Sequence, residues 1–119
     1  MSDYDYEIEH VRRVVDGDTF DLTLAREVDF GFYLVERKRF TLRVRLLDVD
    51  AHETREQLGA QATIFASGWL AGRRGRLRAT TYKTDAFGRW LAVIYDGVTR
   101  ERLADALLRA GLAVPYPRG

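Results

Sequence analysis

The chain has 119 residues, the size of one domain, and 46% of them are apolar, enough for a hydrophobic core of its own. It contains no cysteine, which excludes disulfides, thiolate metal sites and a cysteine nucleophile. No apolar run approaches the roughly 18 residues of a membrane span, and the acidic start MSDYDYEIEHVRR is unlike a secretory signal. We therefore expect an intracellular, cytoplasmic protein that does not contact a membrane.

The net charge of +1 conceals a difference between two parts of the chain. Residues 1–53 carry 8 Lys or Arg and 13 Asp or Glu, whereas residues 54–119 carry 11 and 5. An acidic part attracts cations and a basic part attracts anions such as phosphate. An uneven surface without a function would give the same counts, so charge alone selects no function.

The first half of the chain has the alternating pattern of β-strands. Residues 6–24 predict two strands, because Phe20, Leu22 and Leu24 alternate with polar residues and Asp16-Gly17 is a turn signal. Residues 26–50 alternate again and predict a long hairpin. We expect its turn in the charged run ERKR, residues 36–39, and a bend or bulge at Gly31.

The second half mixes helices and strands. Residues 53–74 change to helical spacing, with Thr54 as expected N-cap and Gly72 as expected stop. Residues 75–97 predict two more strands separated by the turn TDAFG. Residues 98–114 predict an amphipathic helix that ends at Gly111.

This order predicts the fold class. Five strands interrupted by a helix after the third favour a small closed barrel of the OB type over a parallel sheet. We therefore expect an α+β fold, mainly β, in which a five-stranded barrel carries two helices and an extended β-hairpin joins the second and third strands. Residues 1–119 form a single domain in this interpretation.

Acidic residues gather at the ends of two predicted strands: Asp16, Asp18, Asp48, Asp50 and Glu53. Hard divalent cations such as Ca²⁺ are bound by carboxylates, backbone carbonyls and water. Asp18 and Asp50 with a nearby carbonyl would form such a site if the strand ends converge. The simpler interpretation, a polar turn DGD and a polar strand end DVD, stays open, and the spacing is not that of an EF-hand loop.

Two arginines accompany these carboxylates. Arg45 precedes Asp50 on the same predicted strand, and Arg89 follows the TDAFG turn. The planar guanidinium binds phosphate through two parallel hydrogen bonds. A metal, two arginines and a spare carboxylate are the parts that cleavage of a phosphodiester requires. For either arginine alone, a surface ion pair is the simpler interpretation.

Three segments resemble a known family. VVDGDTF, RVRLLDVDAHETR and TDAFGRWLAVIY, in this order, are similar to the motifs of the staphylococcal (thermonuclease-like) nucleases, and LADALLRAGLAV is similar to a later helix of that family. The resemblance covers about residues 11–114. Residues 24–40 form a longer hairpin than in compact members. Three interpretations of this hairpin stay open: it widens a nucleic-acid groove, makes a subunit contact or simply extends the sheet.

The resemblance implies roles for single residues. Asp18 and Asp50 match the carboxylate ligands of the catalytic Ca²⁺, and Ala51 matches the residue that gives it a backbone carbonyl. The residue that follows Ala51 is His52, where the family has proline. His52 has two interpretations: it is a loop histidine that faces solvent, or it is a ligand for a transition metal.

The catalytic residues that the resemblance implies are Arg45, Glu53 and Arg89. Glu53 matches the glutamate that positions or deprotonates the attacking water, and the arginines match those that hold the phosphate. Phe87 and Tyr116 match aromatic residues near the sugar and base of the substrate. Stacking on such rings tolerates any base sequence.

The implied activity is Ca²⁺-dependent hydrolysis of DNA and RNA, with unpaired strands favoured, little sequence preference and 3′-phosphate products. The alternative is an inactive module of the same fold that binds nucleic acid or a protein partner, and a third possibility is a purely structural barrel. A basic run forms either a track for the nucleic-acid backbone or ordinary surface charge: Arg73, Arg74, Arg76, Arg78 and Lys83.

Overall fold

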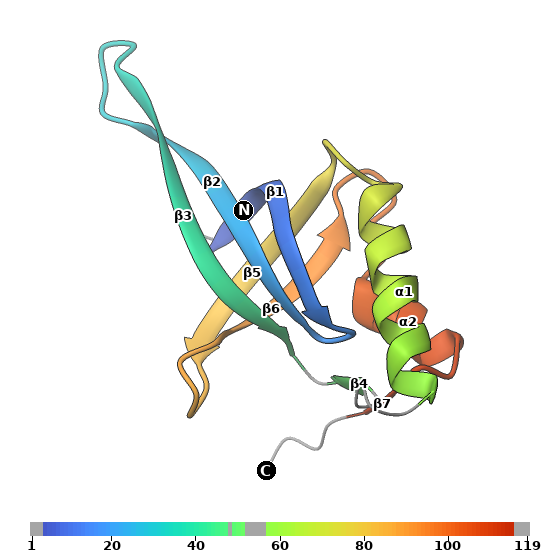
Figure 1. Cartoon of the computed structure of the whole chain (residues 1–119). Helices are drawn as coiled ribbons and strands as arrows, with labels where there is room; N and C mark the ends of the chain where they lie inside the picture. Colours follow the sequence, from blue (N-terminus) through green and yellow to red (C-terminus); the bar gives the residue numbers. More distant parts are fainter. Residues whose placement is uncertain (1–3, 48, 52–56, 116–119) are drawn as a thin grey trace.

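The computed structural model describes residues 4–47, 49–51 and 57–115, and it forms a closed β-barrel beside two helices (Figure 1). The strands of the barrel follow one another in the order β1-β2-β3-β6-β5. Neighbouring strands are antiparallel except β3 and β6, which are parallel. This architecture confirms the predicted α+β barrel of the OB type. The strands are β1 (Asp5–Asp16), β2 (Thr19–Asp29), β3 (Val35–Leu46), β5 (Leu77–Thr84) and β6 (Trp90–Asp96).

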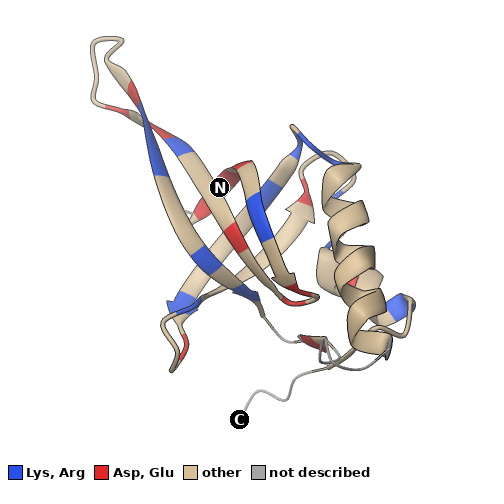
Figure 2. Cartoon of the chain, viewed as in Figure 1, with Lys and Arg blue, Asp and Glu red and all other residues tan. Residues whose placement is uncertain are grey.

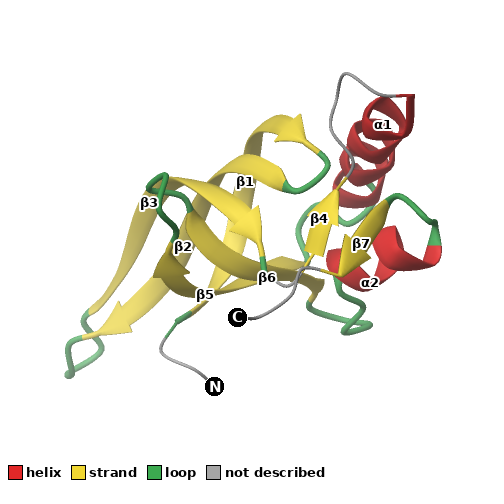
Figure 3. Ribbon diagram, turned by 90° about the horizontal axis from the view of Figure 1, so that it is seen from below, coloured by secondary structure: helices red, strands yellow, loops and turns green. Residues whose placement is uncertain are grey.

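The remaining elements lie at one side of the barrel. Helix α1 (Gln57–Ala71) ends directly before Gly72, as predicted, and α2 (Leu103–Arg109) follows β6. Two short strands that the sequence pattern does not predict, β4 (Val49–Ala51) and β7 (Ala113–Pro115), pair antiparallel beside the helices (Figure 3). The expected N-cap Thr54 lies outside the described residues.

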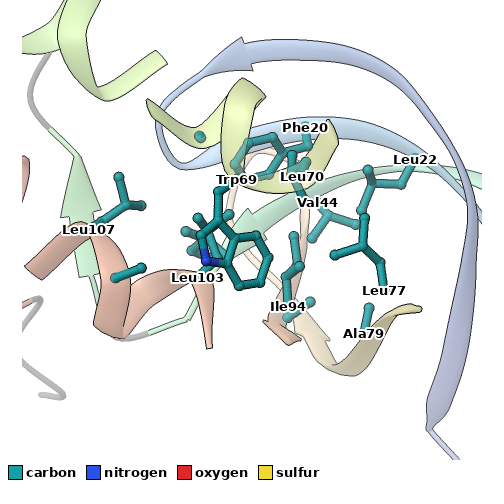
Figure 4. Packing of buried hydrophobic residues seen from close by; sticks show 14 of the residues in the cluster. Phe20, Leu22, Val44, Trp69, Leu70, Leu77, Ala79, Ile94, Leu103 and Leu107 are labelled. Atoms are coloured by element: carbon teal, nitrogen blue, oxygen red, sulfur yellow. The ribbon is translucent and has the colours of Figure 1, made fainter. Parts of the chain in front are cut away.

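The core lies between the barrel and the two helices (Figure 4). The alternating residues of β2, Phe20, Leu22 and Leu24, are fully buried, as their period predicts. Helix α1 adds Trp69 and Leu70 to the same cluster. Truncation of one such large side chain to alanine costs about 2–5 kcal/mol, so this cluster holds the strands in register.

The long hairpin turns at a different place from the one predicted. Residues 36–39 are not a turn, because they pair in β3 with residues 25–28 of β2, and the chain reverses between Phe30 and Leu34. The buried Ala25 is small enough for arginines of β3 to reach across β2. The Nε atoms of Arg37 and Arg39 lie 2.9 and 2.7 Å from carboxylate oxygens of Glu9 on β1. The charged run therefore lies in a strand whose arginines form ion pairs with β1 across β2.

Helix α1 carries no charged residue, in contrast to the strands, where acidic and basic residues interleave (Figure 2). Its buried face consists of Ala62, Ala66, Trp69 and Leu70, whereas Ile64 is 72% exposed. The helical spacing was thus predicted correctly, but not every apolar residue on it is buried. In the described part of the chain, no helix combines the length and the apolar character required to cross a bilayer.

Candidate active site

The turn between β1 and β2 meets the end of β3 and the strand β4 at one end of the barrel. The backbone N–H of Leu46 donates to the carbonyl oxygen of Asp18 at 2.9 Å, which ties the turn to β3. A Cβ atom at Gly17 would lie 2.8 Å from the Cβ of Ala62 and 2.9 Å from that of Ala51, distances that side chains do not tolerate. Glycine at this position lets the turn approach β4 closely.

Arg45 lies between the two predicted metal-binding carboxylates. Its side chain is 11% exposed, and its Nη1 donates to the carbonyl oxygen of Leu46 at 3.0 Å. Its Nη2 forms an ion pair with Asp50 and lies 3.8 Å from Oδ2 of Asp18. The strand ends therefore converge, which is the condition that a cation site between them requires, and Asp18 and Asp50 both lie near one guanidinium nitrogen.

Among the carboxylates of Asp16, Asp18 and Asp50, that of Asp18 is the most buried. Its Oδ2 accepts a hydrogen bond from the backbone N–H of Ala51 at 3.1 Å, and its Oδ1 accepts one from the Thr19 hydroxyl at 3.0 Å. Burial, followed by the neighbouring carboxylate of Asp16, raises the pKa of Asp18 to about 6, although Ala51 N–H and Arg45 act in the opposite direction. Burial of the carboxylate thus outweighs the favourable contacts with Ala51 and Arg45.

These residues fit a hard divalent cation in the chemistry of their donors. The carboxylates of Asp18 and Asp50 are oxygen ligands of the kind that Ca²⁺ prefers, as is the backbone carbonyl of Ala51, a residue whose N–H already contacts Asp18. Among residues 4–47, 49–51 and 57–115, no group of three or more His, Asp or Glu side chains is arranged to hold a metal. The described residues therefore supply part of a ligand set, and Glu53 lies outside them.

A second cluster surrounds Arg89 in the turn between β5 and β6. The carboxylate of Asp85 accepts hydrogen bonds from Nε of Arg89 at 2.8 Å and from the backbone N–H groups of Arg89 and Phe87 at 3.0 and 2.9 Å. Desolvation would raise the pKa of Asp85, but these hydrogen bonds outweigh it and lower the pKa. The guanidinium carbon of Arg89 lies 5.3 Å from the centre of the exposed Phe87 ring.

The sheet register relates the two clusters. Trp90 of β6 pairs with Val44 of β3, so Arg89, directly before β6, and Arg45, on the parallel neighbour β3, lie near each other along the sheet. The structure therefore brings Arg45 together with Asp18, Asp50 and Ala51, and holds Arg89 against Asp85 and Phe87 in the turn before β6. The predicted site residues Glu53 and Tyr116, and also Asp48 and His52, lie outside the described residues.

Two acidic residues have contacts to which sequence reasoning assigned no role. Asp16 accepts a hydrogen bond from the backbone N–H of Asp18 at 3.1 Å, and Asp85 orders the turn that carries Arg89. An aspartate at the start of a turn commonly accepts backbone N–H groups two or more residues later. The glycine at position 88, with φ of 77°, completes this turn signal.

The basic run after α1 is engaged mainly in ion pairs. Arg76 pairs with the fully buried Asp96 at 2.8 Å, Arg78 pairs with Asp5 at 3.0 Å, and Arg73 pairs with Glu101 at 3.0 Å. These contacts favour a structural role for the three arginines over a track for nucleic acid.

A closed five-stranded barrel with converging acidic and basic side chains at one end defines an OB-type protein with a polar site. The family model of the staphylococcal nuclease homologues matches residues 43–118, and the chain belongs to this family. The matched region contains Arg45, Asp50, Ala51 and Arg89, whereas Asp18 precedes it.

Relatives with nuclease names extend the similarity to the N-terminal strands. Two proteins named "Uncharacterized endonuclease", from Escherichia coli O157:H7 and Escherichia coli, are each 29% identical over 108 residues, which cover 89% of this chain and 59% of theirs. "Micrococcal nuclease" of Shigella flexneri is 32% identical over 85 residues, which cover 71% of this chain and 40% of that protein. The chain thus spans less than two thirds of the length of these relatives.

Proposed function

We propose that the chain is a Ca²⁺-dependent endonuclease that hydrolyses phosphodiester bonds of DNA and RNA, with little sequence preference, a preference for unpaired strands and 3′-phosphate products. The observation that carries this proposal is the convergence of Asp18 and Asp50 on the buried Arg45, in a chain of the staphylococcal nuclease homologue family. A purely structural barrel has no need for the buried carboxylate of Asp18 next to the carboxylate of Asp16.

Asp18, Asp50 and the carbonyl of Ala51 would hold the cation. When bound, a divalent cation polarises a phosphate and makes a coordinated water more acidic. Arg45 is already held in place by the carbonyl of Leu46 and the two carboxylates, so its planar fork is ordered before substrate binds. Glu53 is proposed as the residue that orients or deprotonates the attacking water.

Arg89 and Phe87 would contact the substrate from the turn between β5 and β6. Asp85 holds the guanidinium of Arg89, which would offset negative charge that develops on the phosphate oxygens. The ring of Phe87 is 83% exposed and offers a face to a sugar or an unpaired base. Tyr116 is proposed as a second ring of this kind.

The test is incubation of single-stranded DNA and RNA with the protein in Ca²⁺ and then with EDTA. Cleavage only in Ca²⁺, with 3′-phosphate ends, is the expected result. Arg89→Ala should lower kcat about 10²–10³-fold, since it removes a donor to developing charge. The matched control is Arg102→Ala, because Arg102 also pairs with a carboxylate, Asp105, but lies at the start of α2.

Absence of cleavage by the wild type in Ca²⁺ would overturn the nuclease proposal, and cleavage that survives EDTA would overturn the metal assignment. One observation favours the alternative of a binding module: Arg45 and Arg89 both form ion pairs within the chain. Such a module would shift single-stranded DNA in a gel without cutting it, and Arg89→Ala would change binding alone.

A further inference from the structure

The hairpin tip consists of residues 30–35. In the described part of the chain, it is the most exposed continuous apolar segment. It has the sequence FGFYLV and contains no charged residue. Phe32 and Tyr33 are 103% and 102% exposed, and Phe30, Leu34 and Val35 are at least half exposed. Contiguous exposed apolar side chains of this kind mark interaction surfaces.

The tip is an ordered turn. The backbone N–H of Phe30 donates to the carbonyl of Leu34 at 2.8 Å, and that of Leu34 donates to the carbonyl of Gly31 at 2.9 Å. Phe32 and Tyr33 have φ of 53° and 65°, a left-handed conformation that residues other than glycine rarely adopt. The turn thus directs two aromatic rings into solvent at a defined position.

A groove with an apolar floor lies beside the base of the same hairpin. Strand β1 pairs with β5 only from Asp5 to Glu7 and then diverges from it. Two hollows of about 190 and 410 Å³ share lining residues at this divergence and form what we name the β1–β5 groove. The residues of its apolar floor are Ile8, Val11, Val14, Leu70 and Leu77.

Charged side chains of opposite sign that form no ion pair among the described residues lie at the base of the tip and in the groove. At the base of the tip, Glu27 and Asp29 form no ion pair with any residue that the structure describes. In the groove, Arg74 forms none within the same described ranges, whereas Glu9 is bound by Arg37. The two carboxylates beside the apolar tip therefore complement the apolar groove and its Arg74.

We propose that the hairpin tip inserts into the β1–β5 groove of a second copy of this chain, and that two copies exchange their tips about a two-fold axis. Arg37 lies two residues after the tip and also lines the groove, so the tip and the groove share one end of the molecule. Two identical contacts can then close into a dimer instead of an open chain.

The size of the contact is sufficient for a specific pair. A buried aromatic side chain removes about 150–250 Å² of surface from water. Three aromatic residues in each of two tips, Phe30, Phe32 and Tyr33, therefore reach roughly the 1,000 Å² that a specific interface needs. The charges nearest the tip, Asp29 and Glu36, are both acidic, which disfavours nucleic acid and anionic lipid as partners.

The hairpin tip lies far from the candidate active site of its own chain. The pairs Thr19–Arg45 and Asp29–Val35 lie at opposite ends of the β2–β3 ladder, ten residues apart. At 3.3 Å per residue, this separation is roughly 33 Å. Figure 1 shows the hairpin projecting at the end away from β4. Self-association can therefore be tested whether or not the chain is a nuclease.

The experiment is sedimentation velocity of the whole chain from about 1 to 100 µM, the range that separates weak from tight pairs. The wild type should approach twice 13.7 kDa. In the double variant Phe32→Ser/Tyr33→Ser, the dissociation constant of the dimer should rise about tenfold or more, and the circular dichroism spectrum should stay unchanged. The matched control is Ile64→Ser, which removes an exposed apolar side chain from α1 and should leave dimerisation intact.

The groove is tested separately. Arg74→Glu should weaken the dimer about tenfold, and addition of Glu27→Arg should restore it, because the two charges then attract again. Arg12→Glu, which changes an exposed arginine outside the groove, is the charge control.

Three results would overturn the proposal. The first is a wild type that stays monomeric at every concentration. The second is an Arg74→Glu variant that dimerises as well as the wild type, since the tips would then contact each other. The third is a monomer that binds phosphatidylglycerol vesicles or single-stranded DNA through Phe32 and Tyr33.

Discussion

The two ends of the β2–β3 ladder depart from the usual distribution of side chains in opposite directions. At one end, Arg45 and Asp18 are charged groups in a largely buried position. At the other end, Phe32 and Tyr33 are large apolar groups that no part of the chain covers among the residues described. Buried charge and exposed apolar surface are both costly in a folded monomer, so each end indicates a ligand or partner that offsets the cost.

The difference between the ends is how far the chain compensates itself. Around Arg45, hydrogen bonds and opposite charges offset most of the desolvation, and the raised pKa of Asp18 shows the part that stays uncompensated. Around the tip, backbone hydrogen bonds are formed, but the apolar side chains are not covered. We therefore expect substitutions at the site end to change stability and activity together, and substitutions at the tip to change association alone.

The largest effect is expected for Arg45→Ala. It leaves Asp18 and Asp50 without their cation, so the free energy of unfolding should fall by about 1–3 kcal/mol, less than for a fully buried pair because the Asp50 side chain is 44% exposed. Nuclease activity should fall about 10²–10³-fold or more. Chemical denaturation and a cleavage assay measure the two effects.

The control for Arg45→Ala lies two residues away. Arg43 pairs with Asp21 on the exposed outer face of the sheet, at 2.8 Å. Arg43→Ala should cost about 1 kcal/mol or less, the usual value of a surface pair. Equal losses for the two variants would contradict the distinction between a buried and an exposed arginine.

Asp18→Asn should stabilise the protein near neutral pH when EDTA removes metal ions. Because the pKa of Asp18 is raised from 3.8 to about 6, the folded state favours the protonated form. The stability from this group is complete below about pH 4 and is lost as the pH rises through about 6.

A shift of this size corresponds to about 3 kcal/mol at pH 7, and asparagine should recover much of it. Denaturation of both proteins at pH 4 and pH 7 is the measurement. The gain should be small at pH 4, and a variant that is less stable than the wild type at pH 7 would contradict the assignment of burial as the main cause.

Gly17→Ala should destabilise the site end by about 1–3 kcal/mol, because its Cβ would overlap Ala51 and Ala62. Gly68→Ala is the control, since a Cβ at this exposed position of α1 meets nothing within 4 Å. It should stabilise by about 0.5–1 kcal/mol through helix propensity. Thermal unfolding compares the two, and a tolerated Gly17→Ala would show that the turn does not need its close approach to β4.

The smallest effect is expected at the tip. Phe32→Ser or Tyr33→Ser should change the unfolding free energy of the monomer by no more than about 0.5 kcal/mol, because the side chains make no contact that folding could lose. Denaturation at a concentration below dimerisation isolates this quantity. A loss of 2 kcal/mol, about the value of a buried side chain, would place the rings inside the fold.

Local patterns in the sequence were sufficient for the elements of the barrel, apart from the position of the hairpin turn between β2 and β3. The alternation of Phe20, Leu22 and Leu24, the turn at Asp16-Gly17 and the stop at Gly72 each depend on neighbours a few residues away. The ordered motifs around Asp18, Arg45 and Arg89 also predicted the family, which the comparisons show.

The tertiary structure decided what depends on partners distant in the sequence. The run at residues 36–39 reads as a charged turn, but it is a strand because Arg37 and Arg39 reach Glu9 on β1, 28 and 30 residues away. Likewise β4 and β7 are too short to predict and form only by pairing with each other. The approach of Arg45 to Asp18 follows from the β2–β3 register. The tip is exposed because β2 and β3 extend beyond the ends of the strands with which they pair. Composition and periodicity describe the individual strands, whereas the ion pairs and the register that hold the strands together are long-range contacts.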